Sequence, residues 1–193
     1  MILVTGASGL LGTALVSELA SSGEKVRAFD FRPSGQMPAG VDFVHGDIRD
    51  PSAVRRAAER CDTIFHLAAL MHVGRIVPKT VEDVNIGGLK NIMDAAAGSG
   101  VRRIVFTSTI EIYGVRPETP SREDSPKNPP PGYAEHKWRS ENMLSSFSKK
   151  SGVEVAVTRM PLILGPGFYH QKSMLLFFET ISRGLPVPLL DGG

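Results

Sequence analysis

Short apolar runs alternate along this chain with longer stretches in which apolar residues recur at helical spacing. The first run, Ile2–Thr5, is apolar, partly β-branched and followed by glycine, and it is too short for a helix, so it predicts a buried strand. After the glycines, Leu11, Leu15 and Leu19 recur four residues apart, which predicts a helix. Similar apolar runs predict strands over residues 25–30, 41–45, 62–67, 101–108 and 153–160.

The sequence also indicates where helices begin and end. Asp50 and Pro51 are typical of an N-cap followed by a first helical position, and Gly98 and Gly100 are typical of a helix end. On these signals and on periodicity, helices are predicted over 51–60, 81–97, 133–150 and 171–183. Proline, glycine and charge predict loops over 31–40 and 115–132.

Strands that alternate with helices predict a parallel sheet with helices on both faces, joined by right-handed crossovers. This is the doubly wound α/β arrangement, the Rossmann fold. Its ligands bind in a crevice at the carboxyl ends of the strands. The residues that fall at these ends by sequence are Gly6, Asp30, Asp47, Ala68 and Ser108.

Three glycines, Gly6, Gly9 and Gly12, lie between the first strand and the first helix. Glycine allows a tight turn and a close approach to a ligand, and the free amides at a helix N-terminus attract phosphate. An ordinary glycine-rich βα turn is the alternative. Asp30 decides between them, because it ends the next strand about 20 residues on, where a ribose-binding carboxylate belongs.

The same acid favours NAD over NADP as the cofactor. A carboxylate pairs with two ribose hydroxyls but repels a 2′-phosphate. Arg32, two residues further on, could receive a phosphate, although an exposed arginine in a polar loop is the commoner case.

Composition narrows the classes of function. The 193 residues suffice for one domain, or for one domain and part of a second. A formal net charge of +2 with interspersed acids and bases indicates neither nucleic-acid nor membrane binding. The single cysteine, Cys61, excludes an internal disulfide, and the five histidines lack ligand spacing, so no metal is predicted. With no membrane-length apolar run, and a first strand at residue 2, a cytoplasmic protein is expected.

A phenol and an ammonium, Tyr133 and Lys137, lie four residues apart on one face of a predicted helix. The pKa of a free tyrosine, near 10, makes it a poor base, and a nearby ammonium together with a positive nicotinamide ring would lower that pKa. The tyrosine could then take a proton from a substrate hydroxyl or return it. A surface aromatic beside a solvated lysine is the alternative. Thr107–Thr109 ends the preceding strand and could supply a hydroxyl that holds the substrate oxygen.

The chain resembles the extended short-chain dehydrogenases/reductases, of the NAD-dependent epimerase/dehydratase type. The matching stretches occur in the family's order and cover nearly the whole chain. They are TGASGLLG at 5–12, Asp30, Gly46–Ile48, His66–Ala69, Val84–Gly88, TSTIEIYG at 107–114, Tyr133–Lys137 and RMPLILGPG at 159–167.

The resemblance implies a role for each matching residue. The glycine turn, with Ser8, Leu10 and Leu11, would hold the pyrophosphate, and Asp30 the adenosine ribose. Asp47 and Ile48 would hold the adenine, while Leu67, Ala68, Ala69 and Thr107 would line the cofactor. Thr109 would polarise the substrate oxygen, Tyr133 would be the acid/base, and Lys137 would tune Tyr133 and bind the nicotinamide ribose. Asn85 would support its helix or contact the cofactor.

The sequence departs from the family at two places. Leu162 stands where nucleotide-sugar enzymes often have a substrate-binding asparagine, which leaves room for a more apolar substrate. Family members also continue well beyond this length, so we expect an NAD-binding domain over 1–168 and the start of a truncated substrate-binding region over 169–193. The substrate domain would then be largely absent.

Three functions remain open. The leading hypothesis is an NAD-dependent epimerase, dehydratase or oxidoreductase acting on a sugar, nucleotide-linked in the expected case, with a tyrosine acid/base. Glu111 is a candidate second base, but without an Asp–Glu pair epimerisation or oxidation is favoured over dehydration. The alternatives are a dehydrogenase or reductase of an apolar hydroxy compound, hydroxysteroid- or flavonol-like, and a non-catalytic dinucleotide-binding module. The resemblance further implies a homodimer through the helices 81–97 and 133–150.

Overall fold

The computed structural model describes residues 1–32, 37–71, 78–115, 119–165 and 172–186. Two compact units make up the chain, Met1–Ile163 and Leu164–Gly193. The predicted domain boundary, between residues 168 and 169, lies outside the described residues. Within the second unit the described residues form one helix, α6 (Lys172–Ser182).

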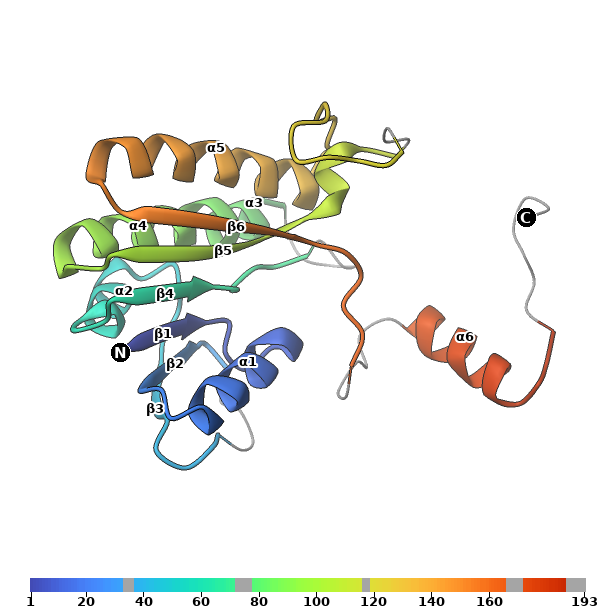
Figure 1. Ribbon diagram of the computed structural model, residues 1–193, viewed down its shortest axis with the longest axis horizontal. Coiled ribbons are helices and arrows are strands. Elements are labelled where there is room, and N and C mark those ends of the chain that lie inside the picture. Colours follow the sequence, from blue (N-terminus) through green and yellow to red (C-terminus); the bar gives the residue numbers. More distant parts are fainter. Residues whose placement is uncertain (33–36, 72–77, 116–118, 166–171, 187–193) are drawn as a thin grey trace. The chain divides into compact units, whose positions relative to one another are not determined.

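The first unit is built on a six-stranded sheet in which every pairing is parallel (Figure 1). The strand order is β3-β2-β1-β4-β5-β6. Strands β2 and β3 extend the sheet on one side of β1, and the chain then crosses back to place β4, β5 and β6 on its other side. The strands are β1 (Ile2–Thr5), β2 (Val26–Asp30), β3 (Asp42–His45), β4 (Thr63–His66), β5 (Arg103–Thr109) and β6 (Glu154–Met160). The predicted Rossmann fold is confirmed.

Helices cover both faces of this sheet. One apolar core joins alternate strand residues such as Leu3 and Phe29 to three helices, and the other joins Val4 and Ala28 to the first helix. The alternation follows from the two-residue period of a strand. The helices of the first core are α2 (Pro51–Ala58), α4 (Gly88–Ser99) and α5 (Tyr133–Ser151), and that of the second is α1 (Leu10–Ser21).

The helix predicted over 81–97 is wrong in detail. It begins earlier, with α3 (Pro78–Glu82), and passes through a π-helical turn, η1 (Asp83–Gly87), before α4 begins. The strand predicted over 101–108 is β5, which includes Thr109 and leads into a 3₁₀ turn, η2 (Ile110–Tyr113). Asp50 caps α2 as predicted, its carboxylate accepting from the Ser52 amide at 2.8 Å.

Among the helices within the described ranges, none has the length and apolar character needed to cross a membrane.

Candidate functional site

The glycine turn, residues 6–12, is shaped by close contacts within the backbone. Gly6 has a φ of +72°, and a Cβ there would lie 2.7 Å from the Ala68 nitrogen. A Cβ on Gly12 would lie 2.1 Å from the Gly6 oxygen. The protein itself therefore requires glycine at both positions.

Gly9 differs, because a Cβ there would meet only the Gly6 oxygen, at 3.2 Å. It is the N-cap of α1, and no side chain caps this helix. The amides of the first turn of α1 are therefore left for a ligand, and the helix dipole makes an anion the preferred one. This is the local geometry that a pyrophosphate needs.

Asp30 lies beside this turn, as the sequence predicts. One carboxylate oxygen accepts from the Ser8 amide at 3.0 Å and the other from the Arg32 amide at 2.8 Å. The Ser8 hydroxyl in turn donates to the Arg32 carbonyl at 2.7 Å. The end of β2 is thus tied to the glycine turn.

A cavity of about 470 Å³ opens at these strand ends. The predicted cofactor-binding residues that line it are Gly6, Gly9, Asp30, Asp47, Ile48, Leu67, Ala68 and Ala69. It is therefore apolar along Ile48 and the 67–69 stretch and polar at Asp30 and Asp47. Phe31 and Arg49 also line it, and sequence reasoning missed both.

Arg49 changes the electrostatics of Asp47. Its Nε donates to both carboxylate oxygens at 3.0 Å, and these bonds hold the pKa of Asp47 below its usual value. Asp47 is therefore ionised, with its oxygens already partly engaged. An arginine two residues after the acid was the available signal in the sequence.

Asn85 lies in the π-helical turn and faces the backbone of Leu70. Its Nδ2 donates to the Leu70 carbonyl at 2.9 Å, and its Oδ1 accepts from the Leu70 amide at 2.8 Å. The amide side chain thus pairs at both ends with the segment after β4. Of the two roles left open by the sequence, this geometry favours support of the fold.

His66 is a further buried group that sequence reasoning missed. Its Nδ1 lies 2.8 Å from the Thr5 hydroxyl, so the side chains of β1 and β4 are joined beneath the glycine turn. Burial, followed by the charge of Lys137, lowers the pKa of His66 to about 3. The imidazole is therefore neutral at physiological pH.

Thr109, Tyr133 and Lys137 form what we call the Tyr–Lys corner. Tyr133 is the first residue of α5, and Lys137 lies one turn further along. The Lys137 Nζ donates to the Thr107 carbonyl at 2.7 Å and lies 5.6 Å from the centroid of the Tyr133 ring. Lys137 is buried, and this burial lowers its pKa to about 7.

Tyr133 carries its proton at neutral pH. Burial, followed by the charge of Glu111, raises the pKa of Tyr133 to about 12. We predicted that Lys137 and a nicotinamide ring would together lower this pKa, but the groups of the protein alone raise it, because desolvation opposes the phenolate. Lowering this pKa would require a bound cation such as the nicotinamide ring, acting together with Lys137 in its charged form.

Thr109 ends β5 with its side chain buried. Its hydroxyl oxygen accepts from the Glu111 amide at 3.2 Å. Because a hydroxyl has one proton to give, this bond leaves the Thr109 proton available for another oxygen. The corner thus offers two neutral O–H donors, Thr109 and Tyr133, and one buried amine.

The sequence matches the NAD dependent epimerase/dehydratase family over residues 2–193. The chain belongs to this family. The resemblance stated from the motifs is confirmed, and so is NAD as the cofactor type, since the family is described as NAD-dependent.

Relatives in this family differ in what they act on. The chain is 31% identical to dTDP-glucose 4,6-dehydratase from Streptomyces antibioticus, over all of this chain and 62% of the relative. It is 35% identical to sterol demethylase protein B from Methylococcus capsulatus, over 85% of this chain and 52% of the relative. The solved structure of Thermus thermophilus UDP-glucose 4-epimerase with NAD matches at a TM-score of 0.84 and 33% identity, covering 96% of this chain and 64% of that one.

The chain spans about half the length of the first curated relatives that it matches, between 48% and 52%. The family match, over residues 2–193, includes the residues of the cofactor cavity and of the Tyr–Lys corner. Leu162, expected to face the substrate, is 49% exposed, and its role stays a prediction.

Proposed function

We propose that this chain is the NAD-binding and proton-transferring part of an epimerase-type oxidoreductase that acts on a nucleotide-linked sugar. The observation that carries the proposal is the Tyr–Lys corner, in which a buried Lys137 lies near the half-buried ring of Tyr133 and bonds to the end of β5, where the Thr109 side chain is buried. The glycine-turn cavity lies at the same edge of the sheet, at the ends of β1, β2 and β4. Nucleotide-sugar epimerases and dehydratases among the relatives support this choice of substrate class.

The residues of the cavity fit the dinucleotide. The uncapped first turn of α1 would hold the pyrophosphate, and Asp30 would accept from the adenosine ribose. Asp47 and Ile48 would face the adenine, and residues 67–69 would line the centre of the cofactor. NAD, when bound, supplies a site that accepts and returns a hydride.

The protein's own contribution is the proton. Tyr133, protonated at neutral pH, donates its proton to a substrate carbonyl and takes one back from a hydroxyl when its pKa is lowered. Thr109 donates a second hydrogen bond to the same oxygen. Lys137, held by the Thr107 carbonyl, favours the phenolate in its charged form.

A dehydrogenase or reductase of an apolar hydroxy compound is the second candidate. Leu162 favours it, because an apolar side chain replaces an expected asparagine. A relative named as a sterol demethylase component supports it as well. The two candidates differ in cofactor turnover, since an epimerase leaves NAD unchanged after each cycle while a dehydrogenase consumes it.

The test begins with calorimetric titration of NAD and NADP. The protein with NAD is then mixed with UDP-glucose, with dTDP-glucose, or with a hydroxysteroid, while reduced nicotinamide is followed by absorbance and the products by chromatography. We expect NAD to bind more tightly than NADP, and a nucleotide sugar to be interconverted without net reduction. Net reduction by the hydroxysteroid alone would favour the second candidate, and binding without any reaction would favour a non-catalytic module.

We also propose that the chain forms a homodimer through α4 and α5, which pack against each other in the structure. The exposed faces of these helices are polar or small at residues such as Lys90, Asp94, Asn142 and Lys149. Sedimentation at several concentrations tests the proposal, and a monomer at all of them would refute it.

A further inference from the structure

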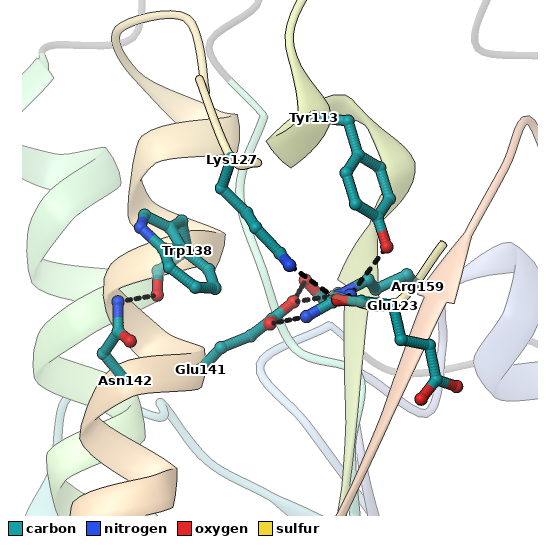
Figure 2. Close-up of polar contacts among 8 residues, drawn as sticks. Tyr113, Glu123, Lys127, Trp138, Glu141, Asn142 and Arg159 are labelled. Atoms are coloured by element: carbon teal, nitrogen blue, oxygen red, sulfur yellow. Dashed lines mark hydrogen bonds and ion pairs between the residues drawn. The ribbon is translucent and has the colours of Figure 1, made fainter. Parts of the chain in front are cut away.

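Next to the Tyr–Lys corner lies a polar cluster that the proposed chemistry does not use, formed by Ser108, Tyr113, Glu141 and Arg159. Figure 2 shows Tyr113, Glu141 and Arg159 of this cluster. At its centre the Arg159 Nη2 donates to the Glu141 carboxylate at 2.8 Å, and the Nε donates to the other oxygen at 3.2 Å. The Ser108 hydroxyl donates to the latter oxygen at 2.5 Å. Only 7% of the Glu141 side chain and 20% of the Arg159 side chain are exposed.

The other side of the guanidinium reaches a different part of the chain. Its Nη1 donates to the Tyr113 hydroxyl at 2.6 Å and to the Glu123 carbonyl at 2.7 Å. Figure 2 shows Arg159 between Glu141 of α5 on one side and Tyr113 on the other. A planar guanidinium can make all of these bonds at once, which an ammonium cannot do.

Residues on both sides of Thr109 in the sequence are bonded within the cluster. Ser108, which precedes it, is tied to Glu141, and η2, which follows it, is tied through Tyr113 to Arg159. Thr109 itself accepts from the amide of Glu111 inside η2. Movement of η2 would therefore move the Thr109 hydroxyl.

Resting on the function proposed above, we propose that Glu141 and Arg159 are positioning residues. They fix the Thr109 hydroxyl at the end of β5 and hold the segment 119–132 against α5, and neither touches the substrate. Lys127 belongs to that segment, and its Nζ lies 5.9 Å from the ring centroid of Trp138 and 5.5 Å from that of Tyr113. The solvent exposure of Trp138 should therefore report whether the segment 119–132 lies against α5.

The chain contains a matched control pair. Arg103 and Glu154 join β5 and β6 at the ends of these strands that lie away from Thr109, with 56% and 66% of their side chains exposed. Glu154→Gln thus removes a carboxylate from an Arg–Glu pair of the same sheet without reaching Thr109. A general effect of losing a carboxylate from an Arg–Glu pair would appear in Glu154→Gln as well.

The variants are Glu141→Gln, Arg159→Lys and Tyr113→Phe, compared with Glu154→Gln. Tyr113→Phe removes one hydroxyl from Arg159 and leaves the ring in place, so it tests the cluster if the other two fold poorly. Trp138 is the only tryptophan of the chain, so quenching by acrylamide reports on one site. We expect the quenching constant of Trp138 to rise roughly twofold in Glu141→Gln and Arg159→Lys, because the segment 119–132 would leave α5 for part of the time and expose the indole ring.

Two further measurements address Thr109. Hydrogen exchange at the Glu111 amide, followed by NMR, should accelerate in the three variants and not in Glu154→Gln. With UDP-glucose as the probe, kcat should fall about 10-fold to 100-fold through misplacement of the hydroxyl, while the Kd for NAD stays within about twofold. In Arg159→Lys the positive charge is kept, but kcat should still fall, because an ammonium cannot make all the bonds of the guanidinium.

Unchanged quenching and unchanged exchange in Glu141→Gln and Arg159→Lys would overturn the proposal. A loss of kcat matched by an equal loss of NAD affinity would also overturn it, because it would indicate general unfolding. If the unaltered protein binds no NAD, the proposed function fails, while quenching at Trp138 and exchange at Glu111 still decide the role of the cluster.

Discussion

The glycine turn and the Tyr–Lys corner lie at the same edge of the sheet but hold their groups by different means. In the turn, backbone contacts fix the geometry, since a Cβ on Gly6 or Gly12 would overlap neighbouring main-chain atoms. In the corner, side chains of α5 pack against the end of β5, and burial sets the pKa of Tyr133 and of Lys137. The shape of the glycine turn is therefore determined by local sequence, whereas the properties of the Tyr–Lys corner depend on tertiary packing.

This difference predicts that Gly6 and Gly12 tolerate no added atom. In Gly12→Ala, the methyl group would lie 2.1 Å from the Gly6 oxygen, so the turn must open. We expect NAD binding to be abolished in calorimetry and the free energy of unfolding to fall by roughly 2–3 kcal/mol. The matched control is Gly98→Ala in α4, where nothing lies within 4 Å of the added Cβ. It should stabilise the protein by about 0.5–1 kcal/mol. Retained NAD affinity in Gly12→Ala would contradict the assignment of the turn.

A substitution in the Tyr–Lys corner should have the opposite effect: NAD binding is kept and turnover is lost. Tyr133→Phe removes the proton donor but keeps the ring beside Lys137. We expect turnover to fall by roughly 10²–10⁴-fold, while the Kd for NAD changes little. Turnover and calorimetry on one preparation check both quantities, and turnover equal to that of the unaltered protein would exclude Tyr133 as the acid/base.

The same contrast explains what the sequence could predict. The glycine turn, Asp30 at the end of β2 and the alternation of strands and helices along the chain follow from local patterns, and the structure has them where the sequence predicts. The pKa of Tyr133 was not, because it depends on burial and on Glu111, which no spacing reveals. The bonds of Asn85 to Leu70 and the cluster around Arg159 likewise join residues distant in sequence, so only the fold brings them together.

Lys137 should give the protein a pH-dependent stability. Its folded pKa, about 7, lies below the ordinary value of 10.5, because burial penalises the ammonium. Between these values the unfolded chain binds more protons, so the free energy of unfolding should rise with pH, by at most about 1.4 kcal/mol per pH unit. Urea unfolding from pH 7 to pH 9 measures the slope.

Lys137→Met should flatten this rise, and Lys149→Met, at an exposed position of the same helix, should not. Equal slopes in the two variants would show that burial of Lys137 is not the source of the pH dependence.

The smallest effect is expected at Asp47, which lines the cavity and bonds to the side chain of Arg49. Arg49→Met would remove the guanidinium from both carboxylate oxygens, while Oδ1 keeps its bond to the backbone amide of residue 49, and the pKa of Asp47 would return toward its usual value. If Asp47 accepts from the adenine amino group, the freed oxygens should tighten NAD binding by about threefold, the equivalent of a fraction of one net hydrogen bond. Asp47→Asn should weaken binding by a similar factor, because an amide accepts through one oxygen only. Calorimetry at one pH compares them, and an unchanged Kd in both variants would place the adenine away from Asp47.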